Sequence, residues 1–473
     1  MYKKIEGAER EQFGSRLGFI LVTAGSAIGL GNIWRFPNMV GSNGGAVFIA
    51  LYILILLCIG LPVLLTEMSL GRGSRKSLAR CFEALEPVGT KWHWAKYPMI
   101  FGNYVVMCYY PVITGWIIYY LWGIASDNFF ASPNTSKEIF SEMISHNNAW
   151  VYVSSMVCVA FCAIVGWFGV NRGIEKITKP MMMILLLCLV ALVIYALCLP
   201  NAMVGVKAYL VPDFSTISFS SLLKTANAAL GQAFFTLGLG VGIILTLASY
   251  MDKRKSLVSE SLVICSLDTI VAIGAGLIIF PACASFGLET TSGPSLLFDS
   301  MLTIFRGIPQ PAGYIFGTTF FVLMVFAALT SVLSIFENML AITMDALEVG
   351  RKKAVLINTA FLLVAVIPAI LSFSLLKDIT VLGLDILSAE DYLFSNILMP
   401  FGALIMVIFC LTRYGWHTNS FYKEVNSGDG LKLAYALRYY IRYFIPLMIV
   451  VVFLGANVPD SVWQAVTSFF TGK

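Results

Sequence analysis

The sequence contains little charge: only 12% of its 473 residues are Asp, Glu, Lys or Arg, about half the usual share in soluble domains. It contains three histidines, His93, His146 and His417, and their wide spacing does not match a metal site. Its ten cysteines form no Cys-x-x-Cys pair and lie mostly in apolar runs, which indicates packing. These shortages argue against a metalloenzyme, a redox protein or a nucleic-acid-binding protein.

Catalytic motifs are also missing. No nucleophile–base pair stands out, and the run GSAIGLGN is not a phosphate loop because no strand–helix unit surrounds it. The first residues, MYKKIEGAEREQFGSR, are too polar for a secretory signal, so no cleavable signal is expected. We therefore expect that the protein is not an enzyme and that it has no organic cofactor, no nucleic-acid partner and no obligatory protein partner.

Hydrophobic residues, in contrast, make up 58% of the chain and gather in long runs. A window of about 19 residues predicts eleven membrane spans, at 16–40, 45–70, 97–124, 150–169, 177–199, 221–250, 257–286, 313–347, 354–376, 388–412 and 438–458. The tail at 459–473 is too short to span a bilayer and is expected at the interface. The fold class is therefore an all-α integral membrane protein.

The basic residues predict the orientation. With the N-terminus in the cytoplasm, all but seven of the 31 Lys and Arg fall at the N-terminal arm or in cytoplasmic loops. The seven others are Arg35, Lys137, Lys207, Lys224, Arg306, Lys377 and Lys473. This asymmetry follows the positive-inside rule, and eleven spans place the C-terminus outside. We expect a multi-pass protein of the cytoplasmic (inner) membrane.

Two spans are interrupted by glycines. The first reads RLGFILVTAGSAIGLGNIWRFP and the sixth LGQAFFTLGLGVGIILTLASY, and they lie five spans apart. Matching broken spans predict an inverted repeat of five plus five helices, with a binding site at the midplane. The simpler alternative is that the glycines only let helices pack closely.

The predicted organisation has seven parts. They are a cytoplasmic arm (1–15), a first five-helix repeat (16–199), an extracellular linker (200–220), a second repeat (221–412), a cytoplasmic loop (413–437), an eleventh helix (438–458) and an extracellular tail (459–473).

The motifs resemble the neurotransmitter:sodium symporter family. They are RLGFILVTAGSAIGLGNIWRFP, then NGGAVFIALYILILLCIGLPVLLTEMSLGR, then GQAFFTLGLGVG, then FAALTS, in order over nearly the whole chain. Eleven spans with short loops are similar to the family's bacterial amino-acid transporters. The resemblance implies the leucine-transporter fold, with helices one and six broken, and inward movement of Na+ coupled to amino-acid uptake.

The resemblance also implies two sodium sites, and Na+ as a hard cation takes oxygen ligands. The first would use Ala27, Asn32, Thr236 and Asp268. The second would use Gly25, Ile28, Ala327, Thr330 and Ser331. For the two hydroxyl residues, hydrogen bonding back to their own helix is the common alternative.

Asp268 departs from many members of the family, which carry Asn at this position, while animal members place chloride nearby. A carboxylate in a low-dielectric site neutralises Na+ directly, and burial favours its protonation once sodium has left. Ala272, one turn on, supplies no polar group. The alternative is an Asp at a helix end that is paired with water.

The substrate site is implied at the first break, where helix amides suit a carboxylate. The implied residues are Ser26, Ala27, Leu30, Gly31, Val106, Tyr110, Phe235, Thr236, Gly238, Val241, Ser331, Val332 and Ile335. Tyr110 matches a hydroxyl that holds the carboxylate, although the adjacent Tyr109 leaves the register open. The uncharged lining favours an apolar substrate, and the small Gly238 and Val241 leave room for an aromatic one.

Gates are implied on both sides. Arg35 and Asp391 match an outer pair with Phe235 as its lid, and Arg10 and Asp345 match an inner pair. Phe13 stands where relatives usually carry Trp, which weakens the expected inner latch. Two buried acids, Glu67 and Glu337, are expected to brace the broken helices. Any single ion pair is as readily explained by simple structural bridging.

The sequence as a whole predicts a symporter that couples Na+ to the import of a hydrophobic or aromatic L-amino acid by alternating access, independent of chloride through Asp268. A transport-inactive amino-acid sensor on the same scaffold is the alternative, and intact sodium ligands argue against it.

Overall fold

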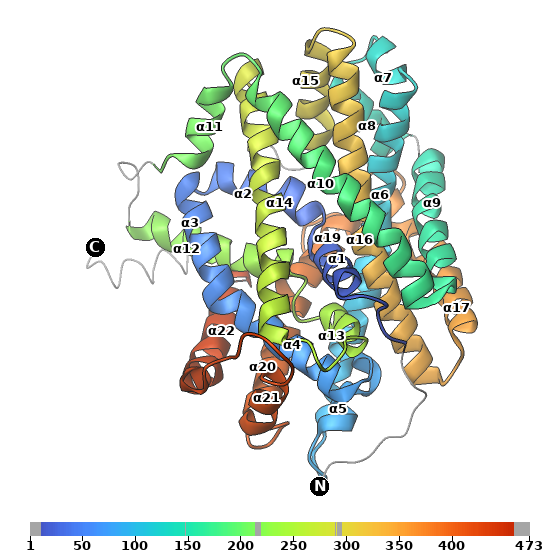
Figure 1. Cartoon of the computed structure of the whole chain (residues 1–473). Helices are drawn as coiled ribbons and strands as arrows, with labels where there is room; N and C mark the ends of the chain where they lie inside the picture. Colours follow the sequence, from blue (N-terminus) through green and yellow to red (C-terminus); the bar gives the residue numbers. More distant parts are fainter. Residues whose placement is uncertain (1–10, 147, 213–218, 289, 291–295, 458–473) are drawn as a thin grey trace.

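The computed structural model describes residues 11–146, 148–212, 219–288, 290 and 296–457. Over these residues the chain forms helices and no β-strand, with two isolated bridges at Lys255–Asp429 and Val381–Leu384. Long helices such as α14 (Leu257–Phe286) and α16 (Ala312–Leu347) run along the long direction of the molecule, whereas α12 (Phe219–Thr236) lies across it (Figure 1).

The first half of the chain carries these elements: α1 (Arg16–Ala27), η1 (Gly31–Arg35), α2 (Phe36–Ser42), α3 (Ala46–Ile55), η2 (Leu56–Gly60), α4 (Leu61–Ser74), α5 (Leu78–Leu85), η3 (Trp92–Ala95), α6 (Lys96–Ala125), α7 (Asn128–Ala131), α8 (Ser136–Ser145), α9 (Asn148–Trp167), η4 (Val170–Glu175), α10 (Lys176–Leu197) and α11 (Ala202–Leu210).

The second half carries these elements: α12 (Phe219–Thr236), α13 (Ile243–Ser249), α14 (Leu257–Phe286), η5 (Leu296–Ser300), α15 (Met301–Gly307), α16 (Ala312–Leu347), α17 (Arg351–Ala365), α18 (Ile367–Leu371), α19 (Ile386–Tyr392), η6 (Leu393–Leu398), α20 (Met399–Leu411), α21 (Thr418–Val425), η7 (Tyr435–Leu437), η8 (Tyr440–Phe444) and α22 (Ile445–Asn457).

Nine helices of the described chain are long and apolar enough to cross a membrane, and one bent pair raises the number to ten. All ten coincide with predicted spans. The remaining prediction, 221–250, falls on α12 and α13, which residues 237–242 separate. The number eleven therefore stays a prediction, as do the boundaries of the seven parts. The predicted interfacial tail, 459–473, lies outside the described residues.

The first predicted break is present. α1 ends at Ala27, η1 begins at Gly31, and the two helical parts meet at an angle of 52°. A Cβ built on Gly29 would lie 2.6 Å from the Ser331 hydroxyl, and one on Gly31 would lie 2.9 Å from the Phe235 ring. The glycines at this break therefore also allow close packing, as the simpler alternative held, because they let neighbouring side chains approach the main chain.

The second break has a backbone that favours glycine. Gly238, Gly240 and Gly242 have φ values of +61°, +94° and +78°, a region that other residues rarely adopt. A Cβ on Gly240 would lie 2.0 Å from the Met399 carbonyl oxygen. The main chain of the break therefore packs directly on α20.

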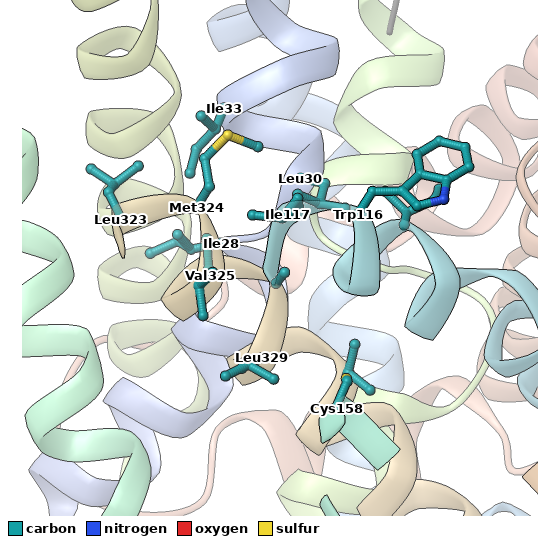
Figure 2. Close-up of a cluster of buried hydrophobic side chains, with 14 of the residues drawn as sticks. Ile28, Leu30, Ile33, Trp116, Ile117, Cys158, Leu323, Met324, Val325 and Leu329 are labelled. Carbon is teal, nitrogen blue, oxygen red and sulfur yellow. The ribbon is translucent and has the colours of Figure 1, made fainter. Parts of the chain in front are cut away.

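Apolar side chains hold the broken segments against the intact helices. Figure 2 shows Ile28, Leu30 and Ile33 of the first break gathered with Trp116 and Ile117 of α6 and with side chains of α16, all members of one buried cluster. The α16 members in this view are Leu323, Met324, Val325 and Leu329. This packing fixes the main chain that surrounds the candidate site.

Candidate functional site

Asp268 is the centre of a buried polar cluster between the two breaks. It is 0% exposed and lies within α14, which excludes the alternative of a helix-end Asp in water. Asn32 Nδ2 donates to its Oδ1 at 2.8 Å, and Thr236 Oγ1 donates to the same oxygen at 3.0 Å. The structure thus brings together three of the four residues predicted for the first sodium site.

The sequence analysis missed a third donor to this carboxylate. Tyr52 Oη, from α3, donates to Asp268 Oδ2 at 3.1 Å, and Tyr52 is fully buried. The side chains among the described residues that hydrogen-bond to the carboxylate, those of Asn32, Thr236 and Tyr52, are all uncharged. A buried carboxylate without a positive partner attracts a cation strongly, because the low dielectric does little to screen its charge. A buried tyrosine in an apolar span was the signal available in the sequence.

The residues predicted for the second sodium site also converge. Ser331 Oγ lies 3.3 Å from the Gly25 carbonyl oxygen and 3.4 Å from that of Ile28. Thr330 Oγ1 lies 3.1 Å from the Ala327 carbonyl oxygen and 2.9 Å from that of Phe326. Thr330 thus hydrogen-bonds back to its own helix, which is the alternative considered for both hydroxyl residues. Ser331 instead hydrogen-bonds to carbonyls of the neighbouring α1 segment. Uncharged oxygens from two helices meet here, which is a ligand set that suits Na+.

A cavity of about 420 Å³ opens beside the first break. Four predicted substrate residues line it: Leu30, Gly31, Tyr110 and Phe235. Lining residues that the sequence analysis did not assign to a site are Trp34, Asn38, Tyr109, Ile113, Leu384, Leu387, Ser388, Tyr392 and Asn396. Most of these come from the segment 384–396, whose approach to the break depends on tertiary packing.

The two adjacent tyrosines of α6 point to different partners, which resolves the register. Tyr110 Oη accepts a hydrogen bond from the Leu30 amide at 3.4 Å. Tyr109 Oη donates to Asp391 Oδ1 at 2.8 Å. Tyr110 therefore faces the helix break, as predicted, and Tyr109 faces Asp391, a residue of the predicted outer pair.

The other predicted substrate residues lie outside the lining of this cavity. They are Ser26, Ala27, Val106, Thr236, Gly238, Val241, Ser331, Val332 and Ile335. Seven of them, all except Ser26 and Gly238, are at most 5% exposed. A Cβ built on Gly238 meets no atom within 4 Å, so open space lies beside this glycine.

The outer-gate residues Arg35 and Asp391 line the same cavity. Arg35 Cζ lies 4.1 Å above the centre of the Phe235 ring, a cation–π contact. Asp391 instead accepts from Tyr109 and, at 3.1 Å, from Ser395. Arg35, Phe235 and Asp391 thus surround one opening without a direct ion pair between Arg35 and Asp391, as far as the described residues show.

The inner pair cannot be placed, because Arg10 lies outside the described residues. Its predicted partner Asp345 accepts a hydrogen bond from the Ser77 amide at 2.8 Å. Phe13, which replaces the usual Trp, packs edge-on against Tyr250 with ring centres 6.2 Å apart. An aromatic contact therefore remains at this position of the expected inner latch.

The two buried acids have distinct partners. Glu67 accepts hydrogen bonds from the amides of Gly240 and Leu245, at 3.0 and 3.4 Å, so it caps main-chain donors at the second break. Glu337 accepts from Arg351 through both carboxylate oxygens, each at 2.8 Å, and from Tyr250 Oη at 2.8 Å.

Two asparagines that the sequence analysis passed over also support the second break. Asn103 Nδ2 donates to the Val241 carbonyl at 2.6 Å, and Asn338 Nδ2 donates to Asn103 Oδ1 at 2.6 Å. Both side chains are fully buried. Asparagine inside an apolar span was the signal that would have found them.

The model of one protein family, described as the sodium:neurotransmitter symporter family, matches residues 10–137 and 140–461. The chain belongs to this family. Family membership makes it a sodium-dependent secondary transporter of the membrane and not an enzyme, as predicted.

Individual members give the same assignment. The chain is 34% identical over 450 residues to the uncharacterized sodium-dependent transporter YhdH of Bacillus subtilis, covering 94% of this chain and 97% of that one. It is 32% identical to an uncharacterized sodium-dependent transporter of Haemophilus influenzae, covering 94% and 98%.

A solved member of similar fold is MhsT, whose crystal structure contains L-phenylalanine. It superposes with a TM-score of 0.84 at 34% identity, covering 95% of this chain and 100% of that one. The predicted all-helical fold of the leucine-transporter type is thereby confirmed, whereas the eleven-span number is not.

Proposed function

We propose that this symporter imports a hydrophobic or aromatic L-amino acid together with Na+ by alternating access, without a need for chloride. The observation that carries the proposal is the buried Asp268 carboxylate, which is surrounded by Asn32, Thr236 and Tyr52 between the two helix breaks. It supplies the negative charge that a sodium ion requires in an apolar setting.

Two sodium ions are proposed. The first would replace the hydrogen bonds that converge on Asp268, so that Asn32 and Thr236 turn oxygens toward the ion, with Ala27 completing the site. The second would lie where the Ser331 and Thr330 hydroxyls approach the carbonyls of α1 and α16. We propose that transport requires no organic cofactor.

The substrate class follows from the cavity and from a relative. The cavity is lined mainly by apolar and aromatic side chains, with one Arg and one Asp at its opening, which suits a zwitterion with an apolar side chain. MhsT, of similar fold, was solved with L-phenylalanine. The substrate carboxylate would meet the Leu30–Gly31 amides and Tyr110, and Arg35, Asp391 and Phe235 would close above it.

The test is uptake of each of the twenty amino acids by proteoliposomes, with and without an inward Na+ gradient. We expect Phe, Trp, Tyr, Leu and Ile to be taken up, and Gly, Ser and Glu to be poor substrates. Undiminished uptake when K+ or choline replaces Na+ would contradict the proposal. Tight Na+-dependent binding without any uptake would favour the sensor alternative.

The cell location and topology complete the proposal. We infer the cytoplasmic (inner) membrane, with the N-terminus inside and the C-terminus outside, from the distribution of Lys and Arg. Labelling of single cysteines, introduced at the exposed residues 137 and 423 of a cysteine-free chain, would test it. A membrane-impermeant reagent applied to whole cells should modify the first and not the second.

A further inference from the structure

A second, smaller cavity lies at the start of the last described span, and it shares no lining residue with the candidate transport site. Its volume is about 170 Å³, and its lining includes His417 and Asn419 with Tyr435, Arg438, Tyr439 and Arg442. Tyr435 Oη donates to Asn419 Oδ1 at 3.0 Å. The cavity is thus held between the beginning of α21 and the segment η7–η8.

The two arginines of this cavity have no acidic partner within the part of the chain that the structure describes. None of the ion pairs between described residues includes Arg438 or Arg442. Arg438 Cζ lies instead 4.5 Å and 4.6 Å above the rings of Tyr435 and Tyr439, and Arg442 Cζ lies 5.4 Å from the centre of the Tyr443 ring. Arg438 Nη2 also donates to Tyr439 Oη at 3.2 Å. Stacking on tyrosine orients a guanidinium, whose five N–H groups allow further hydrogen bonds.

The cavity lies at the end of a membrane span. The apolar helix Tyr435–Gly455 begins with these residues, and α21 and α22 both pack against α20 at the lower end of the molecule (Figure 1). Tyr439, Tyr443 and Leu447 are 57%, 61% and 58% exposed. Exposed tyrosines followed by exposed leucine are typical of a helix that passes from the headgroup layer into lipid.

We propose that this cavity binds the phosphodiester group of an anionic phospholipid, from the leaflet on the side predicted to be cytoplasmic. Arg438 and Arg442 would donate to the phosphate oxygens, with the Tyr439 hydroxyl as a further donor. Paired guanidinium groups match phosphate geometry, and basic pockets between spans are a known form of lipid site. The acyl chains would lie along the exposed apolar face of α22, which begins past Arg442.

The test uses the full chain in detergent, titrated with dioleoylphosphatidylglycerol and followed by native mass spectrometry. We expect saturable binding of lipid that dioleoylphosphatidylcholine does not reproduce. The double variant Arg438→Gln/Arg442→Gln should bind it roughly tenfold or more weakly, because hydrogen bonds between charged groups are lost. Equal binding of the two lipids by the wild-type chain would overturn the proposal.

Arg413→Gln is the matched control. Arg413 also stacks on a tyrosine, with Cζ 4.7 Å from the Tyr414 ring centre, but it does not line the cavity. It should change the affinity less than twofold. An equal loss in this variant and in the double variant would show unspecific attraction to a basic surface, and would overturn the proposal.

One more variant and one competition measurement complete the test. Arg442→Lys keeps the charge and loses the planar fork, so it should weaken binding by an intermediate factor even if the double variant fails to fold. Inorganic phosphate should compete only weakly, because it lacks the acyl chains. Complete displacement of the lipid by inorganic phosphate at low concentration would identify the site as one for free phosphate and overturn the lipid assignment.

Discussion

At the residue scale, Asp268 carries the sharpest prediction. In the proposed function its fixed negative charge balances the first sodium, so Na+-driven uptake by the wild-type protein should persist when gluconate replaces chloride. Asp268→Asn removes that charge while keeping the size of the side chain. We expect the variant to lose uptake in gluconate, with any remaining uptake requiring chloride.

The measurement is the initial rate of uptake by both proteins, each with and without chloride. Tyr52→Phe is a useful companion, because it removes one hydrogen bond to Asp268 and leaves the charge in place. It should weaken transport without creating a chloride requirement. Full chloride dependence of uptake by the wild type would refute the role of Asp268. Uptake by the Asp268→Asn variant that is identical to wild-type uptake in both media would refute it as well.

Gly238 tests the size of the pocket. Open space lies beside this residue, but its φ of +61° strains any side chain. Gly238→Ala therefore serves as the control, because it introduces the backbone strain with little volume. Compared with the Gly238→Ala variant, Gly238→Leu should weaken the binding of tryptophan more than the binding of alanine. The expected difference is about 1–3 kcal/mol, the usual free-energy cost of overfilling a packed site.

Competition of each amino acid against a labelled substrate would measure this difference. An equal loss for alanine and tryptophan would show that Gly238 does not line the side-chain pocket.

At the element scale, the second break depends on close packing of α4 against α13. A Cβ on Gly71 would lie 1.8 Å from the Leu245 carbonyl oxygen, so the two main chains nearly touch. Gly71→Ala should force α4 and α13 apart and destabilise the protein by about 1–3 kcal/mol. Thermal unfolding in detergent would detect this loss of stability, and uptake would be measured in parallel.

Gly231→Ala is the matched control for that variant. Gly231 also lies in a helix, α12, but a Cβ there meets no atom within 4 Å. Alanine should be neutral or stabilising, because it restricts the unfolded chain and favours the helix. If both variants were equally unstable, the loss of stability would come from replacing any helical glycine and not from the contact between Gly71 and Leu245.

At the scale of the whole molecule, sodium should link the two halves of the chain. Ser331 of α16 reaches the carbonyls of α1, and Asp268 of α14 reaches Asn32. An ion bound at either site should therefore stabilise the folded protein by mass action. We expect the unfolding temperature to rise with Na+ and to stay unchanged with equal K+, and the uptake rate to rise more than linearly with Na+.

Ser331→Ala should reduce the sodium-dependent rise in unfolding temperature and leave the temperature in K+ nearly unchanged. A variant equally unstable in both salts would show that Ser331 acts only in packing. A linear dependence of the uptake rate on Na+ would argue for a single coupled ion.

The membrane class, ten of the span positions and the two breaks were predictable from the sequence, because apolar runs, glycines and Lys/Arg asymmetry are local signals. The family motifs also led to Asn32, Thr236, Asp268 and Ser331. Only the tertiary structure decided what surrounds them. Tyr52, Asn103 and the segment 384–396 come from distant parts of the chain, and which polar groups meet across a packed interior depends on how the helices cross.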